Sequence, residues 1–463
     1  MAETLWTSDE LAAATGGRAN GGFTASGVSI DTRTLQPGDL FVALGGARDG
    51  HEFVVQAMAA GAAAALVSQD ILGPSIRVDD TQSALEALGV AARDRATTAR
   101  RAAITGSVGK TSITQAVMAG LSLGGRAHSS VKSFNNHIGV PLTLARMPAA
   151  TQRAVFEIGM NHADEIRPLS RMVRPHVVAV TTVGPVHTEN FSDGEAGVAR
   201  AKAEIFEGLE PGGLAVLNAD NRWCDLLRAE AVRRDAKVVT FGSREGCDAR
   251  LLEFRTGPGE ATVVAQWHGR PLRFAIRQTG LHWGLNSLTV LLVLEAMGVD
   301  LERGLTALGA FEPLAGRGAE RAVRTPLGDF LLIDESYNAN PISMASAIAG
   351  LGARSPSGRR IVALTDMLEL GNDAPAYHAA LAEQLVQAGV DLVFCAGPLM
   401  KSLWDALPPT RRGGYAETAE ALALRLAQAV DAGDVVMVKG SNGSRAGLVA
   451  QALVALDLDG EGG

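Results

Sequence analysis

One stretch of the chain decides the fold, and it reads Thr105-Gly106-Ser107-Val108-Gly109-Lys110-Thr111-Ser112. It follows the apolar run Ala102–Ile104 and leads into a helical pattern of apolar residues that begins at Ile113. A strand, a glycine-rich loop and a helix in this order form a binding site for an anion. The glycines let backbone N–H groups turn toward a phosphate, and the helix N-terminus adds a partial positive charge.

This loop predicts nucleotide binding. Lys110 can reach the outer phosphates, and the Thr111 hydroxyl is placed to coordinate Mg²⁺. The loop has the shorter T-G-x-x-G-K-T form of the motif, because Ile104 stands where a full Walker A motif has its first glycine. A Gly-Lys-Thr tripeptide is common by chance in loops, but here a strand and a helix flank it in the required order. The stretch therefore favours an enzyme that uses ATP.

Length and composition set the broad class of the protein. At 463 residues the chain is too long for one ordinary hydrophobic core, so two or three domains are expected. Apolar residues make up 47% and charged residues 20%, which is typical of a globular protein rather than a disordered one. The formal net charge of −8 argues against nucleic acid as a partner, because nonspecific nucleic-acid binding needs a basic surface.

Other features of the sequence indicate the compartment. Cys224, Cys247 and Cys395 are widely spaced and fit neither a disulfide framework nor a zinc site, which favours a reducing environment. The first ten residues are acidic and lack the basic and apolar pattern of a signal peptide. The longest clean apolar run, Leu288–Leu294, is shorter than the ~20 residues that span a bilayer. We therefore expect a cytoplasmic protein without membrane insertion.

Changes of pattern along the chain predict three α/β domains. Residues 1–83 hold short strands, turns and an alanine-rich helix at Val54–Ala60. Residues 84–314 contain the glycine-rich loop and alternate strands with helices, which indicates a doubly wound parallel sheet. Residues 315–463 resume that alternation as a smaller Rossmann-like domain, after a linker expected at Glu312–Arg317. The expected strands of the two larger domains are Ala154–Ile158, Val177–Thr181, Leu214–Leu217, Phe330–Ile333, Arg360–Leu364, Leu392–Ala396 and Val435–Val438.

Glu157 is the first candidate for chemistry outside the loop. It lies at the end of the predicted strand Ala154–Ile158, and ligands of open α/β sheets collect at the carboxyl ends of strands. A carboxylate there, beside Thr111, would be a natural ligand for Mg²⁺, which prefers hard oxygen donors. Helix capping or a salt bridge is the ordinary alternative for such an acid. The loop upstream makes the metal ligand the favoured interpretation.

Two basic side chains have both an ordinary and a functional interpretation. His187 follows the strand Val177–Thr181, a position that suits a ligand and a simple loop histidine about equally. Lys202 lies in the helical pattern Ala199–Phe206, where a lysine is ordinarily a solvated surface residue. The pattern alone gives Lys202 no further role.

More polar residues lie at predicted element ends in the rest of the chain. Asn286 precedes an apolar helix, where it would cap the helix or, alternatively, recognise an adenine edge. Asp334 ends a predicted strand and could hydrogen-bond a ribose hydroxyl. Asn338 and Asn340 follow it, and turn chemistry alone would explain them. Two other strand ends have polar runs, Asp366–Gly371 and Lys439–Ser441.

These pieces, in this order, resemble the Mur ligases, the ATP-dependent amide-forming enzymes of peptidoglycan synthesis. The resemblance covers nearly the whole chain. In the first domain it rests on Val28–Arg33, Pro37–Leu44 and Asp49–Phe53. In the second domain it rests on Thr105–Ser112 and Ser133–Pro141.

The resemblance implies roles for individual residues. Glu157 and His187 match magnesium ligands of the family, and Lys202 matches the lysine that family members carbamylate to complete a magnesium site. The implied cofactors are ATP and two Mg²⁺ ions, with the metal ligands Thr111, Glu157, His187 and carbamylated Lys202, and with Lys110 as a further catalytic residue. Beyond the glycine-rich loop, the positions that match ATP contacts are Asn286, Arg317 and Asp334. The expected substrate contacts are Ser29, Asp31 and Arg33 in the UDP-binding first domain, and Asn135, Asn136, Tyr337, Asn338 and Asn340 beyond it.

Two segments favour one branch of the family. Tyr337–Pro341 and Asp366–Gly371 resemble the branch that adds D-alanyl-D-alanine to UDP-N-acetylmuramoyl-tripeptide. The Asp-Asn-Pro-Arg motif of the diaminopimelate-adding branch is absent from the sequence. Folylpolyglutamate synthases share the architecture but lack the first domain. Two departures fall in the third domain: Asn442 follows Ser441 where the family usually has arginine, and Thr365 stands where a glycine is common.

The resemblance implies a reaction through an acyl phosphate. The tripeptide carboxylate attacks the γ-phosphate of ATP, and the dipeptide amine then displaces phosphate. We expect a monomer with these two soluble substrates as its partners. Two alternatives stay open: the ligase of the preceding step, which adds one amino acid, and a nucleotide-binding protein that has lost catalysis. The joint presence of Lys110, Thr111, Glu157 and Lys202 argues against the second alternative.

Overall fold

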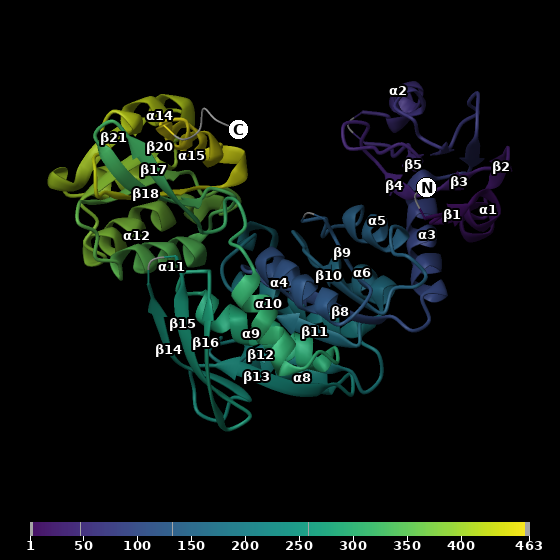
Figure 1. Cartoon of the computed structure of the whole chain (residues 1–463), viewed down its shortest axis with the longest axis horizontal. Coiled ribbons are helices and arrows are strands. Elements are labelled where there is room, and N and C mark those ends of the chain that lie inside the picture. Colours follow the sequence, from purple (N-terminus) through teal and green to yellow (C-terminus); the bar gives the residue numbers. More distant parts are fainter. Residues whose placement is uncertain (1–2, 47, 132, 258, 459–463) are drawn as a thin grey trace.

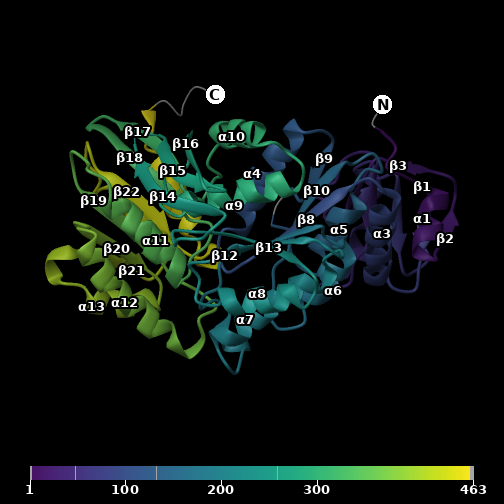
Figure 2. The same ribbon diagram turned by 90° about the horizontal axis from the view of Figure 1, so that it is seen from below.

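The computed structural model describes residues 3–46, 48–131, 133–257 and 259–458. The chain forms an N-terminal, a central and a C-terminal lobe, each built on its own sheet. Figure 1 shows the N-terminal and C-terminal lobes standing apart from each other on the central lobe, and Figure 2 shows the central lobe between them. The predicted mixed α/β architecture is confirmed.

The N-terminal lobe contains a sheet in the order β2-β7-β6-β5-β4, in which β2 is antiparallel to its neighbour and the other pairs are parallel. A separate antiparallel pair joins β1 to β3. The strands are β1 (Trp6–Thr7), β2 (Arg18–Asn20), β3 (Thr24–Ala25), β4 (Gly27–Ser29), β5 (Asp39–Val42), β6 (Ala64–Val67) and β7 (Ser75–Arg77). The helices are α1 (Ser8–Thr15), the 3₁₀ helix η1 (Gly50–Phe53), α2 (Val54–Ala59) and α3 (Thr81–Arg95). Helix α2 confirms the helix expected at Val54–Ala60.

Helix α3 attaches this lobe to the central lobe. Leu85 and Leu88 of α3 share a buried cluster with Leu142 of helix α5 (Gly139–Ala145), which belongs to the central lobe. A Cβ on Gly89 of α3 would lie 3.0 Å from the Pro141 carbonyl oxygen, so the two helices approach closely. The Trp6 indole N–H also donates to the Ala145 carbonyl at 2.8 Å. The N-terminal lobe is therefore fixed by apolar packing and hydrogen bonds together.

The central sheet has the order β16-β15-β14-β13-β12-β11-β8-β10-β9. Its strands are β8 (Arg100–Thr105), β9 (Ala127–Ser129), β10 (Arg153–Glu157), β11 (Val177–Val180), β12 (Leu214–Asn218), β13 (Lys237–Gly242), β14 (Ala249–Thr256), β15 (Ala261–Trp267) and β16 (Arg270–Ile276). Besides α5, its helices are α4 (Lys110–Leu123), α6 (Ile166–Val173), α7 (Glu195–Ala203), α8 (Cys224–Val232), α9 (Trp283–Ala296) and α10 (Leu301–Ala310), with the 3₁₀ helices η2 (Thr188–Asn190) and η3 (Glu204–Gly208).

Helices cover both faces of this sheet, as predicted for a doubly wound fold. Val177 and Ala179 of β11 point toward the cluster that contains α4, α9 and α10, whereas Val178 and Val180 point toward the cluster of α6, α7 and α8. The strand is apolar throughout because both of its faces are buried, which is typical of parallel sheets. Strands β8 to β13 pair in parallel, so their carboxyl ends meet at one edge.

An antiparallel extension was not predicted. Strands β14, β15 and β16 form a meander on the edge of the parallel sheet. Alternate side chains of β15 are buried, namely Ala261, Val263, Ala265 and Trp267. The meander widens the central sheet toward the C-terminal lobe (Figure 1).

The C-terminal lobe has the sheet order β17-β18-β22-β19-β20-β21, parallel except for the edge strand β17. The strands are β17 (Ala319–Thr325), β18 (Gly328–Glu335), β19 (Arg360–Thr365), β20 (Leu392–Ala396), β21 (Arg412–Ala416) and β22 (Val435–Lys439). The helices are α11 (Pro341–Gly352), α12 (Ala374–Gln387), α13 (Met400–Ala406), α14 (Ala419–Ala427) and α15 (Ala446–Val454), with the 3₁₀ helices η4 (Gly371–Asp373), η5 (Pro409–Arg411) and η6 (Asn442–Ser444). Helices α11 to α13 cover one face and α14 and α15 the other, as in the predicted Rossmann-like domain.

The strands expected from the sequence coincide with β10, β11, β12, β18, β19, β20 and β22, with ends that differ by at most two residues. The domain limits after residues 83 and 314 stay a prediction; α3 runs through the first of them. Within the described part of the chain, no helix is long and apolar enough to cross a membrane.

Candidate active site

The glycine-rich loop joins β8 to α4 at the carboxyl edge of the central sheet. Gly106 has a φ of 152°, and a Cβ at this position would lie only 1.9 Å from the Thr181 hydroxyl oxygen. Gly109 has a φ of 84° and occupies the N-cap of α4. Glycine is required at both positions because a side chain would strain the backbone, and at Gly106 it would also meet Thr181, the residue after β11. The loop therefore presents backbone and a helix N-terminus, as a phosphate site requires.

Lys110 and Thr111 begin α4. The Lys110 ammonium donates to the Gly106 carbonyl at 2.8 Å, and the hydroxyl groups of Thr111 and Ser133 are 2.8 Å apart. Burial lowers the pKa of Lys110, the Glu157 carboxylate opposes that shift, and the Arg317 guanidinium adds to it. These influences place Glu157 and Arg317 around the lysine, although the three come from separate parts of the chain.

Glu157 ends β10 and is 2% exposed. The Asn135 side-chain amide donates to its Oε1 at 2.6 Å, while Oε2 is buried without a hydrogen-bond partner. A buried carboxylate oxygen without a donor suits a cation, because leaving it unpaired is costly. Among the residues that the structure describes, no group of three or more His, Cys, Asp or Glu side chains could hold a metal ion. A magnesium site at Glu157 therefore needs other oxygen ligands, such as the Thr111 hydroxyl, phosphates or a modified side chain.

His187 and Lys202 lie close to Lys110 but do not line the cavity described below. Burial, followed by the cations Lys110 and Lys202, lowers the pKa of His187 to about 4, so its ring is neutral at pH 7. Lys202 is 3% exposed, and burial and then the charge of Lys110 lower its pKa well below the ordinary value. The ordinary interpretation of Lys202 as a solvated surface lysine is therefore wrong.

A cavity of about 360 Å³ joins the glycine-rich loop to the C-terminal lobe. From the central lobe it is lined by Ser107–Ser112, Ser133, Asn135, Glu157, Thr181, Thr182, Asn218, Phe241, His282, Leu285 and Asn286. From the C-terminal lobe it is lined by Gly316, Arg317, Glu335, Tyr337, Asn338, Asn340, Ile342, Ser343, Ser346 and Lys439. The structure thus brings together most of the candidates for nucleotide binding and those of the Tyr337–Asn340 segment.

Arg317 and Asn340 show how the C-terminal lobe closes this cavity. The Arg317 guanidinium lies 4.0 Å from the centre of the Tyr337 ring and 3.4 Å from the Ser133 hydroxyl across the lobe boundary. Asn340 caps α11 by accepting the Ser343 N–H at 2.9 Å, and its side-chain nitrogen is buried without a partner. An unpaired amide beside a helix N-terminus suits a polar or anionic group of a ligand.

Two expectations about helix and strand ends are corrected. Asn286 does not precede the apolar helix: α9 begins at Trp283, so Asn286 lies inside its first turn, and the N-cap residue is His282. Its side-chain nitrogen is buried without a partner at the cavity, where a cap would have been satisfied. Asp334 lies within β18, where it accepts the N–H groups of Gly316 and Ser336 at 3.2 and 3.1 Å, and it does not line the cavity.

Other candidates are also occupied by local structure. Asn136 accepts the N–H groups of Ile138 and Gly139 at the start of α5, at 3.2 and 2.9 Å. Thr105 and Gly106 do not line the cavity, because they lie beneath the loop against β11. These three positions shape the loops rather than face the cavity.

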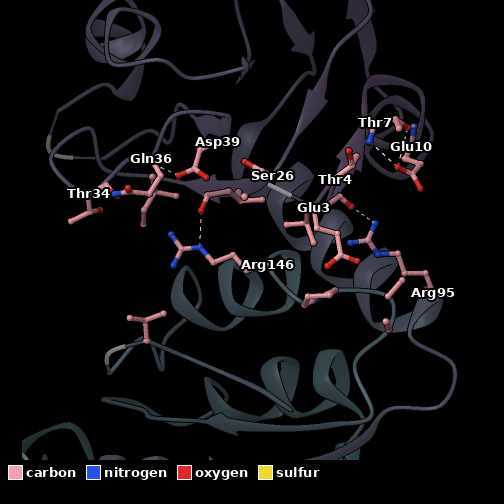
Figure 3. A pocket seen from close by; sticks show the side chains of 18 of the residues that line it. Glu3, Thr4, Thr7, Glu10, Ser26, Thr34, Gln36, Asp39, Arg95 and Arg146 are labelled. Atoms are coloured by element: carbon pink, nitrogen blue, oxygen red, sulfur yellow. Dashed lines mark hydrogen bonds between the residues drawn. The ribbon is translucent and has the colours of Figure 1, made fainter. Parts of the chain in front are cut away.

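A second cavity of about 1050 Å³ lies between the N-terminal and central lobes (Figure 3). Asp31 lines it, whereas Ser29 is buried and donates to the Asp31 carbonyl, and Arg33 is exposed and pairs with the Asp31 carboxylate. Figure 3 shows Arg146 pointing toward the N-terminal strands, where it donates to the Val28 carbonyl at 2.6 Å. Of the first-domain candidates, only Asp31 faces this cavity.

Several cavity residues were not singled out as site residues from the sequence, among them Ser133, His282, Glu335 and Lys439. Lys439 is 2% exposed and donates to Glu335 Oε2 at 3.2 Å and to the Asn338 carbonyl at 3.0 Å. Its position at the carboxyl end of β22 was the available signal, but Glu335, its partner, is distant in sequence. Thr365, which stands where the family commonly has glycine, places its hydroxyl 2.6 Å from the Ser444 hydroxyl. Asn442 begins η6 and Arg445 pairs with Glu420.

Comparison with known proteins identifies the family. The chain matches the models described as Mur ligase family, catalytic domain, at residues 24–97, Mur ligase middle domain at residues 104–294, and Mur ligase, glutamate ligase domain, at residues 321–442. The UDP-N-acetylmuramoyl-tripeptide–D-alanyl-D-alanine ligase of Escherichia coli (strain K12) is 36% identical over 378 residues, covering 81% of this chain and 82% of that protein. The chain belongs to the Mur ligase family.

Two further likenesses extend over almost the full chain. The Mur ligase of the same name from Bacillus subtilis (strain 168) is 31% identical over 445 residues, covering 93% of this chain and 94% of that protein. The crystal structure of MurF from Acinetobacter baumannii superposes with a TM-score of 0.85 at 27% identity, covering 97% of this chain and 99% of that chain. The family expected from the motifs is confirmed.

Proposed function

We propose that this chain is an ATP-dependent ligase that joins D-alanyl-D-alanine to UDP-N-acetylmuramoyl-tripeptide and so makes the pentapeptide precursor of peptidoglycan. One observation supports this most: the cavity in which the glycine-rich loop and Glu157 of the central lobe meet Arg317, Asn340 and Lys439 of the C-terminal lobe. A simple ATPase needs only the first group. A ligase must also hold a second substrate against the phosphates.

The first step is phosphoryl transfer to the tripeptide carboxylate. A carboxylate oxygen attacks the γ-phosphorus, the bond to the β–γ bridging oxygen breaks, and ADP leaves with that electron pair. Such a reaction asks the protein for positioning and charge neutralisation. Lys110 and the start of α4 would neutralise the phosphates, and Arg317 would add a charge from the other lobe.

Thr111, Glu157, His187 and Lys202 would hold magnesium. The unpaired Oε2 of Glu157 and the neutral ring of His187 fit a cation, as the donor set requires. Bound magnesium would supply positive charge at the phosphate oxygens. We expect two ions, as the resemblance to the Mur ligases implies.

Lys202 would serve as a carbamate. Its neutral amine attacks CO₂ and loses a proton, which gives a carbamate anion with two oxygen ligands. An unmodified ammonium would repel the metal, and burial already disfavours that charged form at Lys202. The modification would thereby supply the hard oxygen ligands that Glu157 and His187 alone do not provide.

The second step forms the amide bond. The dipeptide amine attacks the acyl carbon of the acyl phosphate, phosphate leaves with the C–O bonding electrons, and the nitrogen loses a proton. Tyr337, Asn338 and Asn340 lie on the C-terminal side of the cavity, where we place the dipeptide. Water must be excluded because it would hydrolyse the acyl phosphate, and the contact of Arg317 with Ser133, which joins the two lobes beside the cavity, would help to exclude it.

The N-terminal lobe would hold the UDP end of the tripeptide substrate. Asp31 lines the cavity between that lobe and the central lobe. In the loop Ser133–Pro141, the Asn135 side-chain amide donates a hydrogen bond to Glu157. We therefore place the substrate along this loop, from the N-terminal lobe to the phosphates. The same proposal includes a nucleotide contact at Asn286, with Asp334 holding the backbone N–H of Gly316 beside it. We also propose that the protein acts as a cytoplasmic monomer and that its domains end after residues 83 and 314.

Phosphate release by the purified protein tests the proposal. With ATP and Mg²⁺, release should require both UDP-N-acetylmuramoyl-tripeptide and D-alanyl-D-alanine and should yield the pentapeptide. Lys110→Ala should lower release by ~10²–10³-fold, because it removes a charge on the transferred phosphoryl group. Lys237→Ala, which removes an exposed lysine of β13, should leave release unchanged.

Other outcomes would contradict the proposal in distinct ways. Release with the precursor that lacks the third residue and with a single amino acid would assign the chain to the preceding step. ATP binding without release in any combination would indicate a non-catalytic protein. Full activity in Lys110→Ala would refute the role of the glycine-rich loop.

A further inference from the structure

Two residues with unusual backbone conformations face each other across the boundary between the central and C-terminal lobes. His187 Nδ1 lies 3.1 Å from Glu369 Oε2. His187 has a φ of 57° and Glu369 a φ of 63°, in the left-handed region that non-glycine residues seldom occupy. Such conformations persist where the surrounding structure imposes them, and they occur often at functional sites.

Hydrogen bonds hold the loop that presents Glu369. The Met367 N–H donates to His378 Nε2 of α12 at 3.0 Å, and the Leu368 N–H donates to the Ser441 hydroxyl at 3.0 Å. His378 is fully buried, and its Nδ1 contacts the Ala374 carbonyl at 2.6 Å. The backbone before Glu369 is therefore fixed from two sides of the C-terminal lobe.

The two lobes also touch beside this pair. A Cβ on Gly371 would lie 3.0 Å from the Glu189 Cβ, so η4 of the C-terminal lobe and η2 of the central lobe are in close contact. Gly371 has a φ of 61°. The contact between His187 and Glu369 is thus part of a packed boundary and not an isolated approach of two long side chains.

The carboxylate decides which nitrogen of His187 is available. A neutral imidazole has one N–H and one lone pair, and a carboxylate oxygen 3.1 Å from Nδ1 favours, through its negative charge, the tautomer with the N–H on that nitrogen. The lone pair is then on Nε2. Histidines that bind metal ions depend on this arrangement, in which a carboxylate outside the metal's own ligands orients the ring.

We propose that Glu369 is a positioning residue for the magnesium site: from the C-terminal lobe it orients His187, so that this ligand is correctly placed only when the two lobes are docked. The inference rests on the proposed function, because it takes His187 as a metal ligand. Binding free energies are reciprocal, so metal binding must favour docking of the C-terminal lobe by the same factor by which docking favours metal binding.

The size of the effect follows from exposure. The Glu369 side chain is 62% exposed, so the contact itself contributes little to folding stability. Its effect lies in the orientation of the ring. Removing such a partner commonly weakens metal affinity by ~10–100-fold, and exposure places the expectation here at the lower end, ~10-fold.

Metal binding without turnover tests this role. Mn²⁺ would be titrated into the ADP-loaded protein and followed by electron paramagnetic resonance. Glu369→Ala should weaken the tightest Mn²⁺ site by ~10-fold, and Glu369→Gln should have a smaller effect, because its amide keeps an oxygen dipole beside Nδ1 of His187. Glu383→Ala is the matched control, since Glu383 is an exposed glutamate of α12 in the same lobe and should have no effect.

Steady-state kinetics gives a second readout that general damage would not reproduce. In Glu369→Ala the Mg²⁺ concentration for half-maximal rate should rise by ~10-fold, while the KM for D-alanyl-D-alanine stays unchanged. Unchanged Mn²⁺ affinity in both Glu369 variants would overturn the inference. An equal rise of the half-maximal Mg²⁺ concentration and of the KM for D-alanyl-D-alanine would also overturn it. Absence of pentapeptide synthesis by the wild-type protein, with the Mn²⁺ result intact, would refute the proposed function and not this inference.

Discussion

At the scale of single residues, the burial of Lys110 and Lys202 is the most informative feature of the site. Both lysines have lowered pKa values, and burial is the main cause for each. Two buried ammonium groups close to each other would repel, so one of them must lose its charge or gain a counter-charge. Lys110 has Glu157 nearby and keeps a role as a cation. A carbamate on Lys202 would turn the second cation into an anion and remove the repulsion.

Lys202→Arg tests the carbamate directly. Arginine keeps a positive charge and forms no carbamate, so pentapeptide synthesis should fall by ~10²–10³-fold. After incubation with ¹³C-labelled bicarbonate, wild-type protein should give a carbamate signal in carbon NMR that the variant lacks. Near-wild-type turnover in Lys202→Arg, or no labelled signal in the wild type, would show that Lys202 acts in another way.

The sequence could predict those residues whose position follows from the motif or from a strand end. Glu157 is of this kind, because the end of β10 is visible in the apolar run before it. Asn286 was misplaced because an Asn before an apolar run looks like a cap, while the helix begins at Trp283. Ser133 and Lys439 gain their meaning from partners far away in the chain, Thr111 and Glu335, and no local pattern reports such contacts.

At the scale of elements, the turn between β8 and α4 depends on its contact with Thr181, the residue that follows β11. Gly106→Ala should therefore damage the loop: the new methyl group would meet the Thr181 hydroxyl, and the φ of 152° suits only glycine well. We expect ADP affinity, measured by calorimetry, to fall by ~10–100-fold, from a strain of about 1–3 kcal/mol.

Gly22→Ala is the control for that variant, because a Cβ there meets no atom within 4 Å. Adding Thr181→Ala to Gly106→Ala should recover part of the affinity by removing the hydroxyl. Wild-type ADP affinity in Gly106→Ala would contradict the described geometry of the loop.

His378 in helix α12 leads to a separate prediction about the pH dependence of stability. Burial lowers the pKa of His378 below its ordinary value near 6.5, against the opposing effect of its hydrogen bond to Ala374. The unfolded chain therefore binds a proton that the folded chain excludes. The contribution of His378 to the free energy of unfolding is fully present above about pH 6.5. It is lost as the pH falls toward the pKa of the folded state, by at most ~1.4 kcal/mol per pH unit.

Thermal unfolding at pH 7.5 and 5.5 checks this sign. The midpoint should fall on acidification in the wild type, and it should fall less in His378→Gln, whose side chain does not titrate. Part of the fall in the midpoint should remain in His378→Gln, because burial also lowers the pKa values of other histidines, namely His128, His176, His187 and His282. An equal or larger fall in His378→Gln would contradict the assignment.

The same scale shows why β14 to β16 were not predicted. The alternation of α/β units favoured parallel strands with helices between them, and an antiparallel meander has no helix to mark it. The buried residues Ala261, Val263, Ala265 and Trp267 are apolar at every second position, a period-two pattern that the sequence already shows. It identifies a strand, but it does not say which sheet edge the strand joins.

At the scale of the whole molecule, the two outer lobes are attached in different ways. The N-terminal lobe shares a buried apolar cluster with α5 of the central lobe. The contacts of the C-terminal lobe with the central lobe include polar pairs, among them Arg317 with Ser133, Arg354 with Thr279 at 2.8 Å, and His187 with Glu369. Polar contacts exchange readily with water, so the C-terminal lobe is the one that we expect to move when substrates enter and leave.

The three-lobe architecture followed from the chain's alternating pattern, because local patterns define each α/β unit. The relative placement of the lobes did not, since it depends on pairs such as Gly89 with Pro141 that no local pattern reveals. This placement matters most for function: it makes one cavity out of residues on both sides of the boundary.

The most direct test of a ligase site shared by two lobes follows the oxygen atoms. UDP-N-acetylmuramoyl-tripeptide with both oxygens of its terminal carboxylate labelled with ¹⁸O would be incubated with ATP, Mg²⁺ and D-alanyl-D-alanine, and the products weighed by mass spectrometry. If the carboxylate attacks the γ-phosphate and the amine then displaces phosphate, one ¹⁸O must appear in the released phosphate and one must remain in the pentapeptide. Phosphate without label, or release without pentapeptide, would contradict the account.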